Sequence, residues 1–227
     1  MLKNLLKLIF PKLCNGCDEL LLLNENVICS NCRHSLPLTN HHLILNNDTT
    51  KKFYGIIDIE FSASMLYFHK DGIVQKLIHN LKYKGQKNIG TFLGEWYAND
   101  LKNNPIISTV THIIPVPLHK KRLKERGYNQ VDEFCEALSK ELDIPFNKSL
   151  LQRKKYSATQ TKKNKTERQF DNNNIFDVTF TKKDENKHYL LIDDVITTGA
   201  TLELCAKTLL KIPNTKISIV TIAFTQS

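Results

Sequence analysis

The sequence contains no apolar run of about 18 residues, the shortest that a transmembrane helix needs. Residues 1–10 are largely apolar, but Lys3 and Lys7 interrupt them and no small-residue cleavage site follows. A secretory signal peptide carries such a site after an unbroken apolar segment. We therefore expect a cytoplasmic protein without a transmembrane segment.

Two widespread phosphate-binding motifs are also missing. The chain has no GxxxxGKS or GxxxxGKT segment and no GxGxxG segment, which excludes a P-loop and the common dinucleotide fingerprint. Acidic residues are scarce: 23 Asp and Glu face 32 Lys and Arg, for a formal charge of +9 that favours a polyanionic partner. With 227 residues, 41% of them hydrophobic, the chain is neither disordered nor a disulfide-stabilised miniprotein.

Six cysteines are present, and in a cytoplasmic protein they are not expected to form a disulfide framework. Four of them form two CxxC motifs: Cys14, Cys17, Cys29 and Cys32. Such a pair of motifs supplies four thiolates in the tetrahedral arrangement that zinc prefers, and leaves no open coordination position. We expect a structural Zn²⁺ ion in a small module over residues 1–45, the alternative being four unligated thiols. Cys135 and Cys205 lie in helical patterns and are expected to be buried apolar residues.

The rest of the chain reads as one domain over residues 53–227, after a polar linker at 40–52. Strand-like segments alternate with amphipathic helical patterns. Strands are expected at 55–60, 62–68, 110–115, 175–180, 189–192 and 217–224, and helices from 73 to 81, 88 to 101, 129 to 142 and 201 to 211. This alternation predicts an α/β fold whose parallel sheet has helices on both faces, with ligands at the carboxyl ends of the strands.

The most informative window follows the strand at 189–192. Asp193 and Asp194 are expected at its end, and a short loop of Thr197, Thr198, Gly199, Ala200 and Thr201 then opens a helix. Small residues and a helix amino terminus let backbone N–H groups approach an anion, whereas two carboxylates accept hydrogen bonds from hydroxyls. The window therefore predicts a ribose 5-phosphate site, the alternative being a strand that ends in acids before a polar helix cap.

This window resembles the phosphoribosyl-pyrophosphate (PRPP) motif of type I phosphoribosyltransferases. The resemblance implies a type I phosphoribosyltransferase-like sheet, with Asp193 and Asp194 on the ribose hydroxyls and residues 197–201 on the 5-phosphate. It also implies a pyrophosphate loop and Mg²⁺ bound together with PRPP. That loop maps to Pro115, Val116, Pro117 and Leu118, with Arg122 and Arg126 nearby.

Further motifs are similar to those of the ComF family of competence-associated proteins. They are the paired CxxC motifs, Leu81-Lys-Tyr-Lys-Gly85, His112-Ile-Ile-Pro-Val-Pro-Leu-His119, Arg126-Gly-Tyr-Asn-Gln130 and the spaced run Arg153, Gln160, Arg168. One departure is Asp171, where the family usually has Asn. This resemblance implies a role in natural transformation, with single-stranded DNA and a competence helicase as partners.

Positive charge is concentrated in two stretches. Residues 148–168 hold eight basic residues and one acid, and residues 120–126 hold five basic residues and one acid. With Tyr128 and Tyr156 as stacking faces, the pattern is typical of single-stranded nucleic acid binding. The residues assigned to nucleic acid or to a flexible loop are Lys82, Lys84, Arg153, Lys154, Lys155, Gln160 and Arg168. The alternatives are a solvated lysine-rich loop and charge that serves pyrophosphate alone.

Three functions fit these observations. The first is a ComF-type protein that binds PRPP and single-stranded DNA. The second is an active phosphoribosyltransferase of nucleotide metabolism, a glycosyltransferase that transfers a pentosyl group, although no nucleobase-binding hood is recognised. The third is a PRPP-sensing regulator without turnover.

Overall fold

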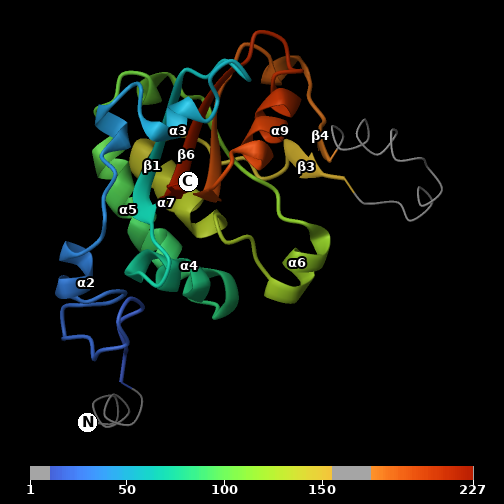
Figure 1. Ribbon diagram of the computed structural model, residues 1–227. Coiled ribbons are helices and arrows are strands. Elements are labelled where there is room, and N and C mark those ends of the chain that lie inside the picture. Colours follow the sequence, from blue (N-terminus) through green and yellow to red (C-terminus); the bar gives the residue numbers. More distant parts are fainter. Residues whose placement is uncertain (1–10, 155–174, 227) are drawn as a thin grey trace.

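A parallel four-stranded sheet in the order β1-β6-β5-β2 forms the centre of the computed structural model, which describes residues 11–154 and 175–226 (Figure 1). The strands are β1 (Phe61–Phe68), β2 (His112–Pro115), β5 (His188–Ile196) and β6 (Lys216–Thr225). All three strand pairings are parallel. The α/β fold with a parallel sheet, predicted from the alternation of strands and helices, is confirmed.

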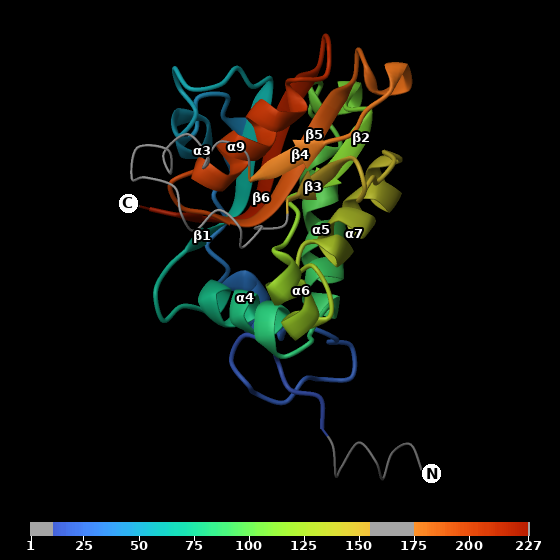
Figure 2. The same ribbon diagram turned by 90° about the vertical axis from the view of Figure 1, so that its right-hand side faces the viewer.

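Helices cover both faces of the sheet (Figures 1 and 2). Side chains alternate between the faces along each strand, so apolar strands present buried side chains to helices on both sides. On one face, α4 (Ile73–Tyr83), α5 (Asn88–Leu101) and α7 (Asp132–Leu142) share a core with Ile113, Leu190 and Val220. On the other face, Ile114, Leu191 and Ile219 pack with α9 (Ala200–Leu209). The antiparallel pair β3 (Leu151–Arg153) and β4 (Phe176–Val178) lies beside α9.

The segment expected to be a linker packs on the sheet instead. It contains the short helices η1 (His41–Leu43) and α3 (Asp48–Lys51), both in contact with β1. A chain of buried hydrogen bonds runs from His41 Nδ1 to Thr49 Oγ1 at 2.9 Å, then to Ser64 Oγ at 2.7 Å and on to Thr221 Oγ1 at 2.7 Å. Polar composition therefore reflected a buried hydrogen-bond network rather than a solvated connection. The strand expected at 55–60 is not formed: residues 55 and 56 belong to a turn, residues 57–60 are irregular, and β1 begins at Phe61.

Besides α3, two more helices of the described residues were not expected from the sequence, α2 (Ser30–His34) and α6 (Lys120–Arg126). Two further 3-10 turns complete the described elements, η2 (Ile107–Thr109) and η5 (Lys182–Asp184). Among the described residues, no helix combines the length and the apolar character needed to cross a bilayer.

The cysteine-containing segment shares its core with the main sheet. Cys14, Val27 and Ile28 belong to the same cluster of buried residues as α4 and α5. Helix α4 also makes two polar contacts to this segment: Asn80 Nδ2 donates to the Asn15 carbonyl at 3.0 Å, and Lys76 Nζ lies 2.5 Å from Asp18 Oδ2. The division into a module at 1–45 and a domain at 53–227 stays a prediction.

Candidate functional site

Asp193 and Asp194 lie inside β5, which continues to Ile196, and not at its end as the sequence suggested. The neighbouring strand β2 stops at Pro115, which is in register with Ile192. Residues 193–196 therefore project past β2 while they still pair with β6. The acidic pair is thus held rigidly on a strand, at the edge where parallel-sheet proteins bind ligands.

The Asp194 carboxylate is paired with a lysine from a different part of the chain. Lys82, near the end of α4, places its Nζ 2.8 Å from Asp194 Oδ2, and the two side chains are 22% and 7% exposed. Among the described residues, no donor makes a well-formed hydrogen bond to Asp194 Oδ2. A carboxylate oxygen has two lone pairs, and this buried one has Lys82 as its ion-pair partner. It therefore retains capacity to accept a hydrogen bond from a ligand hydroxyl.

The Asp193 carboxyl is held in the protonated form over a wide pH range. Burial and the adjacent Asp194 charge raise the pKa of Asp193 to about 8, although the Asp194 N–H, which donates to Asp193 Oδ1 at 2.8 Å, opposes this. The charges of Lys82 and Arg153 also lower this pKa, so Arg153 of β3 belongs to the electrostatic surroundings of the pair. A carboxyl group with a raised pKa at a ligand-binding edge is typical of a functional site.

The loop after β5 has the geometry of an anion cradle. Gly199 adopts φ +84° at the N-cap position of α9, a left-handed conformation that glycine accepts without strain. Thr197, Thr198, Ala200 and Thr201 are exposed at the start of this ten-residue helix, where the Ala200 N–H makes a long hydrogen bond of 3.4 Å to Thr198 Oγ1. A Cβ at Gly199 would lie 3.3 Å from Phe53 Cε1, so the loop also packs closely on the segment after α3.

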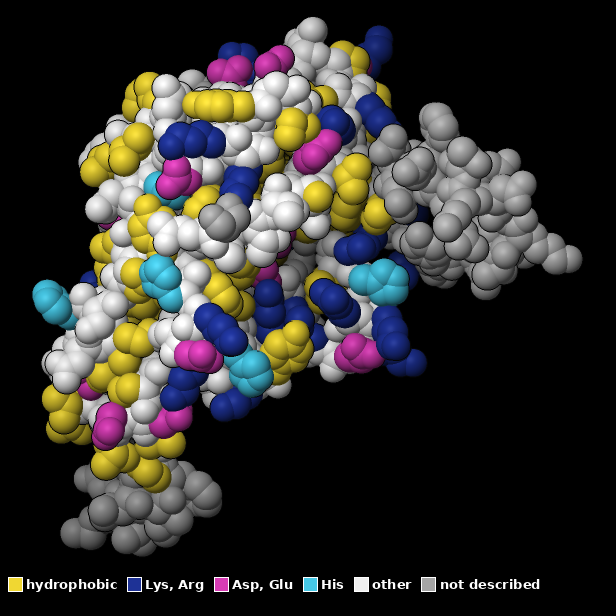
Figure 3. Space-filling view, viewed as in Figure 1, with side chains coloured by type: hydrophobic (Ala, Val, Ile, Leu, Met, Phe, Trp, Pro, Cys, Tyr) yellow, Lys and Arg dark blue, Asp and Glu magenta, His cyan; other side chains and the backbone are white. Residues whose placement is uncertain are grey.

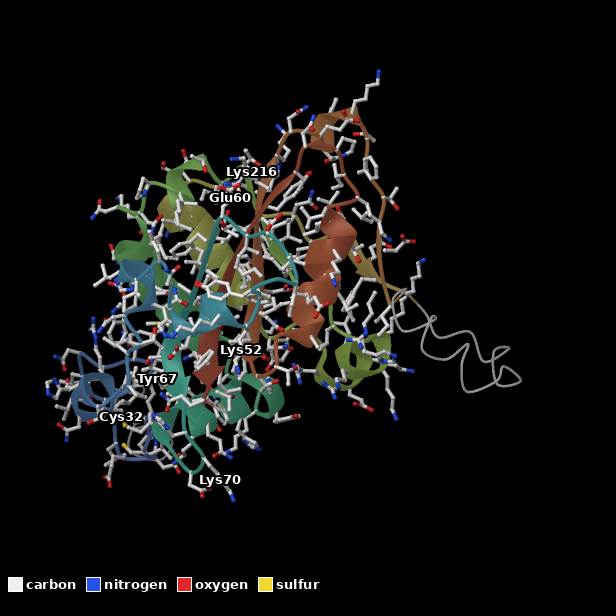
Figure 4. The ribbon with its side chains drawn as sticks, turned by 45° about the horizontal axis from the view of Figure 1, so that its top comes forward. Cys32, Lys52, Glu60, Tyr67, Lys70 and Lys216 are labelled. Atoms are coloured by element: carbon white, nitrogen blue, oxygen red, sulfur yellow. The ribbon has the colours of Figure 1, made fainter. Side chains whose placement is uncertain are left out.

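Sequence reasoning missed Lys52, which lies next to this loop. Its Cβ is 3.6 Å from the position that a Gly199 Cβ would take, and its Nζ lies 5.4 Å from the centre of the Phe224 ring. Figure 4 shows Lys52 well separated from the Lys216–Glu60 ion pair, whose Nζ and Oε1 are 3.2 Å apart. In the sequence, Lys52 is the last residue of the segment expected to be a linker, so it was not predicted to be part of a site.

The residues assigned to pyrophosphate follow β2. Pro115 ends the strand, the Val116 N–H donates to the Ile192 carbonyl at 2.8 Å, and the Val116 carbonyl accepts from Asn129 Nδ2 at 2.9 Å. Pro117 and Leu118 are half-buried and lead into α6, which carries Arg122 and Arg126. These bonds fix the start of the loop against β5, next to the acidic pair.

A cavity of about 310 Å³ lies between the end of α4 and α6. Its walls include the side chains of Lys82, Tyr83, Arg122, Glu125, Arg126 and Tyr128. Figure 3 shows Lys and Arg side chains gathered over α4 and α6. Lys82 therefore joins two features, because it lines this cavity and also pairs with Asp194.

Other residues assigned to nucleic acid or to a flexible loop are not brought to the acidic pair. Lys84 is the exposed C-cap residue of α4, and Lys154 Nζ lies 3.6 Å from Asp177 Oδ2. Lys155, Gln160, Arg168, Tyr156 and Asp171 lie outside the described residues.

The four cysteines of the paired motifs converge as expected. Their Sγ atoms all lie within 4.8 Å of one another, and those of Cys17 and Cys29 are 3.7 Å apart. Although burial raises it, N–H donors from Cys29, Gly16 and Cys17 lower the pKa of Cys14 to about 7, which favours a thiolate. Zn–S bonds of about 2.3 Å in a tetrahedron give sulfur separations of this size, so the cluster fits a zinc ion.

Gly16 lies within the first CxxC motif but is not needed there for a left-handed turn. Its φ is not in the left-handed region, and Asp18, at φ +66°, makes that turn. A Cβ at Gly16 would lie only 2.8 Å from Cys32 Sγ. Glycine is thus needed here because the Cys32 sulfur approaches the backbone closely.

Comparison with known proteins agrees with this arrangement. Residues 133–227 match the family model described as "Phosphoribosyl transferase domain". The chain is 33% identical to Competence protein F of Haemophilus influenzae over 91% of this chain and 88% of that protein. The chain belongs to the ComF family. Within that family it is also similar to Competence protein ComFC of Bacillus subtilis, at 33% identity over 84% of this chain and 81% of the relative.

A third ComF-family relative is DNA utilization protein YhgH of Escherichia coli K12, at 26% identity over 88% of this chain and 92% of the relative. The phosphoribosyltransferase match includes the acidic pair, the loop at 197–201 and β6. The family and the phosphoribosyltransferase-like fold with its four-cysteine cluster are therefore confirmed.

Proposed function

We propose that this ComF-family chain binds PRPP together with Mg²⁺, binds single-stranded DNA, and acts in DNA uptake during natural transformation. The observation that carries the proposal is the position of Asp193 and Asp194 on the same strand that leads into the Gly199 loop. One strand thus offers acceptors for ribose hydroxyls and, three residues later, donors for a 5-phosphate.

The residues around this strand fit the other parts of PRPP. Arg122 and Arg126 follow the loop after β2, where a diphosphate would be met by planar, permanently charged donors. Mg²⁺ held by the diphosphate oxygens would neutralise part of their charge. Asp193 and Asp194 orient the sugar, and the backbone at 197–201 fixes its phosphate.

Two observations support the DNA part of the proposal. The basic residues of α6 and the end of α4 gather on one side of the molecule (Figure 3), as a polyanion site requires. Curated relatives are named competence and DNA utilization proteins. A cytoplasmic location, expected from the sequence, and a competence helicase partner, implied by the family, belong to the same proposal.

Calorimetry tests the sugar-phosphate site. Wild type should bind PRPP in the presence of Mg²⁺, and Asp193→Asn/Asp194→Asn should lose that binding. The control is Asp58→Asn/Asp143→Asn, which removes two exposed carboxylates away from the strand that carries the acidic pair. Equal PRPP affinity in the Asp193→Asn/Asp194→Asn variant and the control would refute the site.

Catalysis is a second candidate, favoured by the match to the phosphoribosyltransferase domain. An active enzyme would release pyrophosphate from PRPP when an acceptor is supplied, with transfer of the pentosyl group. A PRPP-sensing regulator would instead change its DNA affinity with PRPP and release no pyrophosphate. One assay of pyrophosphate release and one of DNA affinity therefore separate the two.

A further inference from the structure

An accessible aromatic ring lies in the cavity between α4 and α6. Tyr83 is 70% exposed, although the His79 ring centre lies 5.2 Å from the Tyr83 ring centre and the Arg126 guanidinium carbon 5.4 Å from it. Aromatic rings usually bury most of their surface. An exposed ring beside a guanidinium group is a surface on which another π system can stack.

Tyr128, expected to offer a stacking face, is half-buried and also has a structural role. Its hydroxyl donates to the Leu81 carbonyl, and Lys87 Nζ lies 4.8 Å from the centre of its ring. Tyr128 thereby holds the end of α4 against the segment after α6. Tyr83 is therefore the more accessible of the two rings that line the cavity.

The cavity also carries an excess of positive charge. Lys82, Arg122 and Arg126 line it together with one acid, Glu125. Arg122 and Arg126 are four residues apart on α6 and therefore share one face of that helix. A diphosphate alone would use these cations but not the ring, whereas a nucleotide offers both a phosphate and a base.

We propose that this cavity holds one nucleotide of a single-stranded DNA chain, with the base stacked on Tyr83 and the phosphate at Arg122 and Arg126, in place of the diphosphate assigned to these arginines above. The inference rests on the DNA binding proposed above and names its contact site. A volume of about 310 Å³ is at the lower end of small-molecule pockets, so the cavity suits a single unit of the strand. Lys82 lies between this unit and Asp194, which brings the strand beside the sugar-phosphate site.

Fluorescence anisotropy with a labelled oligo-dT tests the contact. Tyr83→Leu keeps an apolar side chain but removes the π face, and should weaken binding by about 5- to 150-fold, the effect of one base–aromatic stack. Tyr83→Phe keeps the face and should stay within about twofold of wild type. Tyr54→Leu is the control, because Tyr54 is 55% exposed but lies outside the cavity walls.

Two further measurements separate stacking from charge. An oligonucleotide with abasic sites has the same backbone and no bases, so Tyr83→Leu and wild type should bind it equally. Arg122→Gln should reduce the slope of log affinity against log salt by about 0.7, the value for one phosphate of a single strand. Tyr83→Leu should leave that slope unchanged.

Three outcomes would overturn the inference while the proposed function stands. The first is that Tyr83→Leu and wild type bind oligo-dT equally. The second is that Tyr83→Leu loses as much affinity for the abasic strand as for oligo-dT. The third is that thymidine monophosphate displaces the strand at concentrations similar to those of the oligonucleotide. Loss of PRPP binding in Tyr83→Leu would also overturn it, because Tyr83 would then belong to the sugar-phosphate site or the fold. If wild type bound no oligonucleotide at all, the DNA part of the proposed function itself would fail.

Discussion

Lys82 Nζ lies 2.8 Å from Asp194 Oδ2, and this ion pair joins the end of α4 to the strand that carries the acidic pair. Lys82 belongs to the Leu81-Lys-Tyr-Lys-Gly85 motif that the ComF resemblance singled out. The motif therefore has a structural explanation: it places a cation on Asp194 and, one residue later, an aromatic ring in the adjacent cavity.

We expect Lys82→Met to lower the free energy of unfolding by about 1–3 kcal/mol, because it leaves the nearly buried Asp194 charge without its partner. Urea denaturation at pH 8 measures this. The control is Lys51→Met, which breaks the exposed pair with Asp48 and should change stability by less than about 0.5 kcal/mol. Adding Asp194→Asn to Lys82→Met should restore part of the loss; an equal stability of Lys82→Met and wild type would contradict the role of the pair.

The raised pKa of Asp193, about 8, predicts a pH-dependent stability. Above about pH 4 the unfolded chain loses this proton, whereas the folded chain keeps it until about pH 8. The contribution of the Asp193 carboxyl to the free energy of unfolding is therefore fully present below about pH 4 and is lost as the pH rises to about 8. Urea denaturation midpoints should fall more steeply with pH in wild type than in Asp193→Asn. Asp58→Asn, which removes an exposed carboxylate, should follow wild type; parallel curves for all three proteins would show that the Asp193 proton is not held.

Gly199→Ala should weaken binding of ribose 5-phosphate by about tenfold or more, since a left-handed backbone strains alanine by about 1–2 kcal/mol and the new Cβ presses on Phe53. Calorimetry with ribose 5-phosphate measures the change. Gly55→Ala is a matched control, because Gly55 has φ +70° with no atom within 4 Å of its Cβ position. It should lose similar stability and keep its affinity, so an equal affinity loss in both variants would argue against a phosphate cradle.

Metal analysis of the purified protein should find about one zinc ion per chain. Cys14→Ser should lose it, and Gly16→Ala should lose much of it because the added Cβ would displace Cys32 Sγ. Cys205→Ala, a buried cysteine far from the cluster in sequence, should keep the metal. A full complement of zinc in Cys14→Ser would exclude the four-cysteine site.

Much of the fold follows from local pattern. The helix at 88–101 has the same bounds as predicted, because its apolar residues recur at helical spacing. Helix α6 was missed because five of its seven residues are basic and Leu123 is its single apolar residue, which leaves no apolar periodicity. The packing of residues 41–51 was missed because polar side chains satisfied inside a network look the same in sequence as polar side chains in water.

The sequence predicted which residues the candidate site contains, but not the contacts between those that are far apart in the chain. The acidic pair and the glycine loop are contiguous in sequence, so one window contained both. Lys82 and Tyr83 lie more than a hundred residues earlier, and only the packing of α4 against the sheet brings Lys82 to Asp194. Contacts between distant segments depend on tertiary structure, which periodicity does not encode.

Helix α4 contacts the cysteine segment through Lys76 and Asn80 and reaches Asp194 through Lys82. Its eleven residues form a helix about 16 Å long. A shift of the residues that contact the cysteine segment would therefore also move Lys82. If the proposed zinc ion and sugar-phosphate site are correct, we expect zinc depletion to weaken sugar-phosphate binding through this helix.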